Sequence, residues 1–306
     1  MLRQSPLLGF KTPSMPERIV VTMFADDTTV YLTMGDDIQI LTVILDNWCA
    51  ASGAKFNIEK TEFVPIGPEP YRLQLIQTRK LCINAAELPA YINIAGEGEA
   101  KHFLGAWIGN GTNQEGIWST TVEKIQSRLL QWEKTMPTIE GRRIIIQWII
   151  GGMTQYLTNV QGMPKAICKT INSICNKFKW DNEGRATINA PTMSNNIETG
   201  GKCILNITDR NDAIVLGWVR DYLKPAPDKP TWAYFMDNIL SKIARPTPVV
   251  PFPLRTNVFL QSWTVTQKSL PLNIKKMLQT AKKYGVCINP LELSEEQAGS
   301  MPVWFH

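Results

Sequence analysis

Two adjacent carboxylates, Asp26 and Asp27, are the residues of this sequence best suited to chemistry. Neighbouring carboxylates repel each other unless a cation lies between or beside them. A bound Mg²⁺ removes that repulsion, because this hard cation prefers oxygen ligands at a fixed spacing. The alternative is a solvated turn, since aspartate is common in turns for its local hydrogen bonding. The pair alone therefore leaves a metal site and a plain turn open.

The segments on either side of this pair must position it. Residues 19–24 and 28–33 are rich in β-branched and aromatic side chains, and the acidic break lies between them. Two such runs around a short polar break are typical of a β-hairpin. We therefore predict two strands with the carboxylates at the tip.

The tetrapeptide Phe24-Ala-Asp-Asp27 between two apolar strands resembles the Phe/Tyr-x-Asp-Asp box of reverse transcriptases, and more narrowly that of non-LTR (LINE-type) retrotransposons. The resemblance implies an RNA-directed DNA polymerase with a two-metal mechanism. Asp26 and Asp27 would be catalytic ligands of Mg²⁺. The implied partners are an RNA template, a DNA primer and deoxynucleotides.

One departure from that family is large. The fingers and the palm strand with the first catalytic aspartate, which the family places before this box, have no counterpart in the sequence. We therefore expect a truncated, downstream fragment of a polymerase that is inactive alone. The missing upstream portion would then be a partner.

A helix and a strand are expected after the hairpin. Ile38, Leu41, Leu45 and Trp48 form one apolar stripe, with Asp36 and Asp37 as capping residues and Gly53 at the end. Residues 56–64 alternate and predict a strand. Residues 51–62 resemble the family's next palm block, which implies that Lys60 lies near the nucleotide phosphates and acts in catalysis. A solvated lysine at a strand edge is an equal alternative.

The segment His102-Phe-Leu-Gly-Ala-Trp-Ile-Gly109 predicts a second, small hairpin with a glycine at its turn. It resembles the primer-grip hairpin of the same family. The resemblance implies that Phe103, Leu104 and Gly105 hold the end of the growing strand. Gly105 would let a sugar-phosphate approach the backbone closely.

Helices are expected from about residue 119, with a break at Pro137. An apolar helix of residues 144–156 is expected at the centre of its bundle, and Pro164 at the first position of the next helix. The order of Trp132, 139–142, Pro164 and 178–180 resembles the thumb of the same family.

The helix expected at residues 165–179 is amphipathic. Its apolar stripe faces away from Lys165, Lys169 and Lys179, and this lysine face carries no acid. Such a face is suited to tracking the phosphates of a nucleic acid. An ordinary solvated surface is the alternative.

Composition and charge limit the function classes. With 44% hydrophobic residues in 306, the chain can bury a core. Residues 1–70 carry nine acids against five bases, and residues 121–180 carry nine bases against three acids. The six cysteines form no CxxC pair, so a zinc site is not expected. We expect an intracellular protein, nuclear or cytoplasmic, that does not bind a membrane.

The predicted fold class is α+β. We expect an incomplete reverse-transcriptase palm at residues 1–112, a helical thumb at 113–182 and a mostly helical connector at 183–306. Motifs at 191, 200–202, 211–213 and 218 continue the order of the thumb landmarks. The C-terminal motifs at 230–232, 259–263, 281–285 and 302–306 resemble the family's post-thumb connector. The rival hypothesis is a non-catalytic nucleic-acid-binding or interaction protein derived from such an element.

Overall fold

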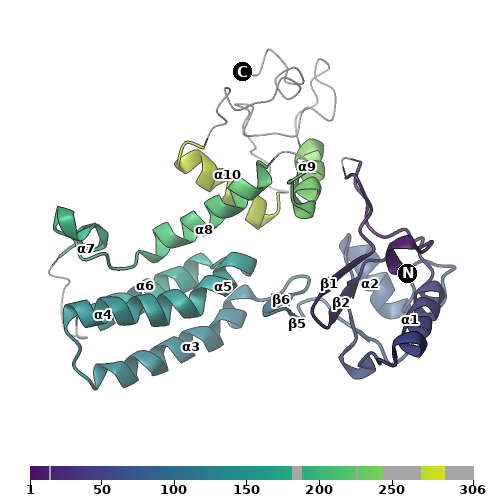
Figure 1. Cartoon of the computed structure of the whole chain (residues 1–306), viewed down its shortest axis with the longest axis horizontal. Coiled ribbons are helices and arrows are strands. Elements are labelled where there is room, and N and C mark those ends of the chain that lie inside the picture. The colour runs from purple at the N-terminus through teal and green to yellow at the C-terminus, as the bar shows by residue number, and fades with distance from the viewer. Residues whose placement is uncertain (14, 181–187, 225–226, 244–269, 287–306) are drawn as a thin grey trace, which may run out of the picture. The chain divides into compact units, whose positions relative to one another are not determined.

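A computed structural model describes the chain except residues 14, 181–187, 225–226, 244–269 and 287–306 (Figure 1). The described residues form helices and three two-stranded sheets, which confirms the α+β class. They divide into two compact units. The first includes residues 1–99 and 224–243, and the second includes residues 100–223 and 272–284.

The first unit contains the hairpin β1 (Val21–Phe24) and β2 (Asp27–Val30), and the parallel pair β3 (Glu62–Phe63) and β4 (Asn93–Ile94). Its helices are α1 (Ile38–Ser52), α2 (Glu69–Thr78) and α9 (Thr231–Ile243), with 3₁₀ turns η1 (Leu2–Gln4) and η2 (Ile58–Lys60). Its buried core consists of small aliphatic groups: Leu7, Val20, Ile38, Leu41, Leu75, Leu81 and Leu88.

Helix α1 begins and ends as the sequence predicts. The Asp37 side chain accepts a hydrogen bond from the Gln39 backbone N–H at 2.9 Å, and Gly53 ends the helix with a φ of 70°. Asp36 has a different role, because its buried carboxylate accepts from the backbone N–H groups of Leu8, Gly9 and Thr33. Buried charge is tolerated when several donors satisfy it. Asp36 therefore ties the N-terminal segment to the turn before α1.

The second unit begins with the hairpin β5 (Lys101–Phe103) and β6 (Ala106–Ile108). Helices α4 (Ile139–Ile145) and α5 (Gly152–Gln161) lie end to end, and α3 (Gln114–Glu133) and α6 (Lys165–Lys179) run alongside them (Figure 1). A π-helical segment, η3 (Ile146–Gly151), joins α4 to α5. Next come α7 (Ala190–Ser194), η4 (Ile197–Thr199), α8 (Ile207–Tyr222) and α10 (Leu272–Lys283).

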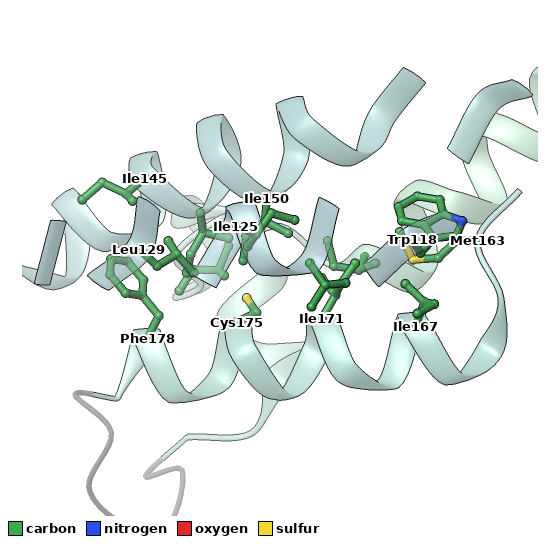
Figure 2. Close-up of a cluster of buried hydrophobic side chains, with 14 of the residues drawn as sticks. Trp118, Ile125, Leu129, Ile145, Ile150, Met163, Ile167, Ile171, Cys175 and Phe178 are labelled. Atoms are coloured by element: carbon green, nitrogen blue, oxygen red, sulfur yellow. The ribbon is translucent and has the colours of Figure 1, made fainter. Parts of the chain in front are cut away.

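The core of the helical unit is one continuous cluster (Figure 2). Trp118, Met163 and Ile167 lie at one end, and Leu129 and Phe178 lie at the other. The predicted break at Pro137 is confirmed by the gap between α3 and α4. Pro164 is the N-cap of α6, one position before the predicted one.

Several sequence predictions keep their status. The boundaries at 112 and 182 stay predictions, although the hairpin β5–β6 lies in the second unit with the helices. The motifs at 259–263 and 302–306 and the prolines at 225 and 246–253 lie outside the described residues. Among the described residues, no helix is both long and apolar enough to cross a membrane.

Candidate nucleic-acid interface

The two aspartates lie at the tip of the predicted hairpin. Phe24 and Asp27 are paired in register, which leaves Ala25 and Asp26 as a two-residue loop. Ala25 has a φ of 53°, and positive φ in the loop matches the twist of the flanking strands. Asp27 is the first residue of β2 rather than part of the turn. Both strands are shorter than predicted, since β1 begins at Val21 instead of residue 19 and β2 ends at Val30 instead of residue 33. Both carboxylates are exposed.

The donor set for a metal ion is partial in the described residues. No group of three or more His, Cys, Asp or Glu side chains gathers there in a way that could hold a metal. Asp26 and Asp27 provide oxygen ligands of the type Mg²⁺ prefers, and two carboxylates with bound water would hold one such ion, but a two-metal mechanism needs more donors than this pair. The Mg²⁺ site therefore stays a prediction.

Lys60 lies on a turn and not on the predicted strand. Its backbone N–H donates to both the backbone and the side-chain oxygen of Asn57, and the Thr61 hydroxyl donates to the Asn57 carbonyl at 3.0 Å. These local bonds compete with strand pairing. The prediction of one strand over 56–64 is therefore wrong, since only Glu62–Phe63 pairs. The Lys60 side chain is exposed, and its catalytic role stays a prediction.

The second hairpin is confirmed. Phe103 pairs with Ala106, and Leu104 and Gly105 form the turn with φ values of 47° and 78°. Two consecutive positive φ values are the mark of a type I′ hairpin turn, in which glycine is favoured.

Helix α5 holds this hairpin through polar contacts. The Gln161 amide accepts from the Trp107 backbone N–H at 2.8 Å and donates to the Trp107 carbonyl at 3.1 Å. This side chain therefore pairs with the edge of β6 as a neighbouring strand would. The Tyr156 hydroxyl donates to the Leu104 carbonyl at the turn.

The same contact explains Gly105. A Cβ at this position would lie 2.9 Å from a ring carbon of Tyr156, which is too close. The predicted close approach at Gly105 is therefore made by a tyrosine of the same chain on that side. Phe103 and Leu104 are half-buried and Gly105 is exposed, so the turn is fixed against α5 while part of it faces solvent.

Two of the three lysines predicted to form the solvent-facing surface of α6 are exposed. Lys165 and Lys169 are exposed on the helix, and Lys177, which was not predicted, is exposed as well. Lys179 is only 5% exposed. Its ammonium donates to the Asn176 side chain at 3.0 Å and lies over the Trp180 ring, and burial lowers its pKa. The assignment of Lys179 to a solvent-facing lysine surface is therefore corrected.

The apolar helix from α4 to α5 was predicted at the centre of its bundle, but it is not buried on every side. One side of it is exposed. Ile144 is 46% exposed, Trp148 is 76% exposed and Tyr156 is 51% exposed. Gly152 lies between Trp148 and Tyr156, and a Cβ there would meet nothing within 4 Å. We call these four residues the exposed ridge. Its glycine leaves a notch between two aromatic side chains.

The π-helical segment keeps the exposed ridge aligned. In an α-helix, each residue is rotated about 40° past a full turn relative to the residue four positions before it. Side chains spaced four apart therefore move gradually around the helix axis. A π turn holds more residues, and a residue four places on there falls short of a full turn. Segment η3 therefore offsets the drift between Ile144 and Tyr156.

Arg210 on α8 stabilises the end of this segment. Its guanidinium donates to the Gly151 carbonyl at 3.2 Å and to the Thr154 hydroxyl at 2.8 Å. The Thr154 hydroxyl in turn donates to the Ile150 carbonyl at 2.6 Å. The carbonyls of Ile150 and Gly151 thus accept side-chain hydrogen bonds at the point where the helix changes from π to α geometry.

Sequence reasoning missed Trp148, Gly152, Tyr156, Gln161 and Arg210 as candidate residues. The available signal was the regular spacing of Trp148, Gly152 and Tyr156, four residues apart. The structure brings Tyr156 and Gln161 together with the predicted turn at Leu104 and Gly105. The aspartates and Lys60 belong to the other unit.

Comparisons with known proteins do not assign a family. No family model and no curated protein matches this chain. The resemblance to a reverse transcriptase therefore rests on the motifs quoted above and on their order.

Proposed function

We propose that this chain is the part of a non-LTR reverse-transcriptase-like polymerase that holds the primer–template duplex. The observation that carries the proposal is the exposed ridge of Ile144, Trp148, Gly152 and Tyr156, fixed to a β-hairpin whose sequence resembles a primer grip. In this reading residues 1–112 derive from a palm, 113–182 from a thumb and 183–306 from a connector.

The chemistry of the exposed ridge suits the sugar edge of a nucleic-acid groove. The notch at Gly152 admits a ribose or deoxyribose close to the helix backbone, because no side chain fills it. Trp148 and Tyr156 offer flat apolar faces on either side, and aromatic faces contact sugars and bases without regard to sequence. This combination gives contact with a duplex of any sequence, which a polymerase needs.

Lysines of α6 would supply the electrostatic part of binding. Lys165 and Lys169 have no ion-pair partner among the described residues, and α6 contains no acid. Lysines that neutralise phosphates release counterions and bind without sequence preference. They would therefore hold the backbone of the same duplex.

Asp26 and Asp27 would be the catalytic end of the proposal, with Lys60 near the nucleotide phosphates. Asp26 and Asp27 would hold Mg²⁺, which would supply Lewis-acid chemistry to the primer 3′-hydroxyl and to the leaving pyrophosphate. The contribution of the chain's own residues is two exposed carboxylates on adjacent residues at the end of a tight hairpin.

A non-catalytic nucleic-acid-binding protein is the second candidate. It is favoured by the absence of a third carboxylate near Asp26 and Asp27 in the described residues. Both candidates predict duplex binding, and both allow an isolated chain that does not extend a primer, so only extension that depends on Asp26 would decide between them, in favour of the enzyme. For the isolated chain we expect no extension of a DNA primer on RNA with Mg²⁺ or Mn²⁺. Extension that is lost in Asp26→Ala would establish the enzyme.

Substitution of Gly152 tests the binding proposal. Gly152→Leu fills the notch but has open space in the fold and a better helix propensity, so we expect the free energy of unfolding to rise by about 0.5–1 kcal/mol. Binding of a fluorescent RNA–DNA hybrid with a recessed 3′ end, followed by anisotropy, should weaken roughly tenfold or more, since a filled notch excludes the sugar.

Gly217 provides the matched control. It lies inside α8, and a Cβ there also meets nothing within 4 Å. Gly217→Leu should stabilise the fold in the same way and leave hybrid binding unchanged. Equal affinities of the two variants and the wild type would refute the exposed ridge as the duplex contact.

A further inference from the structure

Helix α10 carries a second lysine surface that the proposed function does not use. The helix contains four lysines and no acid. Met277, Thr280 and Ala281 are buried, and α10 packs against α8 within the second unit. Lys275, Gln279 and Lys282 are exposed. At 100° per residue these three lie within about 60° of each other and opposite the buried side.

We propose that this face of α10 binds the phosphate backbone of a double-stranded nucleic acid. We call Lys275 and Lys282 the α10 lysine pair. They are seven positions apart, about 10 Å along the helix axis, and two flexible lysine side chains with this spacing can reach nearby phosphates of one strand. The pair can therefore contact two phosphates of one strand.

The charges of the α10 lysine pair are not neutralised within the chain. Neither ammonium has a carboxylate partner among the described residues. Lys283 differs, since its ammonium donates to Asp212 of α8 at 2.7 Å and lies over the Tyr284 ring. That ion pair raises the pKa of Lys283 and anchors the end of α10. Lys283 therefore has a structural partner, and the α10 lysine pair faces solvent.

Helix stability does not explain the position of Lys275. The positive end of the helix dipole is at the N-terminus, where cations are not favoured, and Lys275 is the fourth residue of α10. Lys282 lies in the last turn, where a cation is favourable whatever it binds. Lys275 is thus the more informative member of the pair.

A nucleic acid fits this face better than a membrane. A basic amphipathic helix binds a membrane by inserting its apolar side. In α10 that side is covered by α8, and the outward-facing residues are charged or polar except Leu272 at the first position, which is 80% exposed. A single exposed leucine does not provide an apolar face that could insert into a membrane. The proposal needs no polymerase activity and does not depend on the exposed ridge.

The test is the salt dependence of binding by the full chain to a short, blunt DNA duplex of arbitrary sequence. In Lys275→Gln/Lys282→Gln, we expect the slope of log Kd against log salt to fall by roughly 1.5–2, since each lost phosphate contact removes about 0.9. The circular dichroism spectrum and the melting temperature should stay unchanged. The control Lys11→Gln/Lys55→Gln removes the same charge from exposed sites in the first unit and should leave the slope unchanged.

Each other outcome overturns the proposal. An unchanged slope in the α10 variant would identify this face as an ordinary solvated surface. An equal fall in the control would attribute the effect to net charge. If the variant instead loses binding to vesicles containing phosphatidylserine and keeps its DNA slope, the partner is a membrane. Because Gly152→Leu leaves the α10 lysine pair intact, failure of the exposed ridge and failure of this face give different results.

Discussion

Basic side chains of the helical unit divide by burial into two kinds. Arg142 is 6% exposed, and its guanidinium donates to the carbonyls of Pro137 and Phe178. Lys179 is buried against Asn176 and Trp180. Arg142 ties the start of α4 to the end of α6, whereas the contacts of Lys179 lie within the end of α6 and the residue after it. Lys165 and Lys169 stay exposed, which leaves them free for a nucleic acid.

Residue identity alone could not separate the two kinds. In the sequence, Lys179 lies on the polar side of α6 by helical periodicity, as Lys165 and Lys169 do. Lys179 is the last residue of α6, and Trp180, the C-cap that follows it, no longer has helical backbone geometry. The Trp180 ring lies against Lys179 and contributes to its burial. The periodicity of an element predicts a face but not what covers that face at its ends.

Cys175 offers a pH-dependent test at the residue scale. Burial raises the pKa of its thiol from 9.0 to about 11, while the nearby Lys179 acts in the opposite direction. The neutral thiol is favoured in the fold, so its stabilisation is complete below about pH 9. It is lost as the pH rises from about 9 to about 11, where the unfolded chain ionises first.

We expect the advantage of the wild type over Cys175→Ala to shrink by roughly 2–3 kcal/mol across this interval, at about 1.4 kcal/mol for each pH unit. Urea unfolding of both proteins under reducing conditions measures it. A difference that stays constant from neutral to alkaline pH would mean that the thiol is not held neutral by the fold.

At the scale of elements, the sequence predicted what local chemistry decides. Helix α1 was predicted with its Asp37 cap and Gly53 end, and both hairpins were predicted from their strand patterns and turns. In each case the signal lies within a few residues of the element. The predicted strand at residues 56–64 is the exception, because hydrogen bonds to Asn57 form a turn where the alternating pattern predicted a strand.

Features that depend on distant residues were not predictable. The exposure of Trp148 depends on which side of the helix α3, α6 and α8 cover, and an apolar run does not contain that information. The end of the π segment is hydrogen-bonded by Arg210, which is far along the chain. Docking of β5–β6 depends on Gln161, whose side chain acts as a strand edge.

The docked hairpin gives an element-scale prediction. In Gln161→Ala, the Trp107 amide loses its acceptor, and this bond contributes about 1 kcal/mol. We expect the Trp107 amide to exchange its hydrogen roughly fivefold faster while the helix core keeps its protection. Gln155→Ala, an exposed position on the same helix, is the control and should change neither. Unchanged exchange at Trp107 would show that the hairpin is held by other contacts.

At the scale of the whole molecule, charge is distributed unevenly between the two units. Residues 1–70 of the first unit are acidic on balance and contain Asp26 and Asp27, whereas α6 and α10 of the second unit carry eight lysines and no acid. A polymerase needs both properties, since carboxylates hold metals and lysines hold the duplex backbone. In the proposed polymerase, the first unit would serve the metals and the second the duplex.

The hairpin β1–β2 carries a consequence for the behaviour of the whole chain. Within the described residues it is a two-stranded sheet, and a hairpin of this size is marginally stable without further strands. Met23 is 65% exposed and Phe24 is 68% exposed. A strand with an open edge and exposed apolar side chains is a template for pairing with another chain.

We therefore expect the isolated chain to associate with itself as concentration rises, measured by sedimentation velocity. Met23→Lys places a charge on the edge strand and should reduce this association, because edge charges oppose strand pairing. Met136→Lys makes the same change at a residue that is 86% exposed in the second unit, and it should leave association unchanged. If the wild type is a monomer at every concentration, the edge of β1 is not available for pairing, and the hypothesis of an incomplete palm loses its main physical consequence.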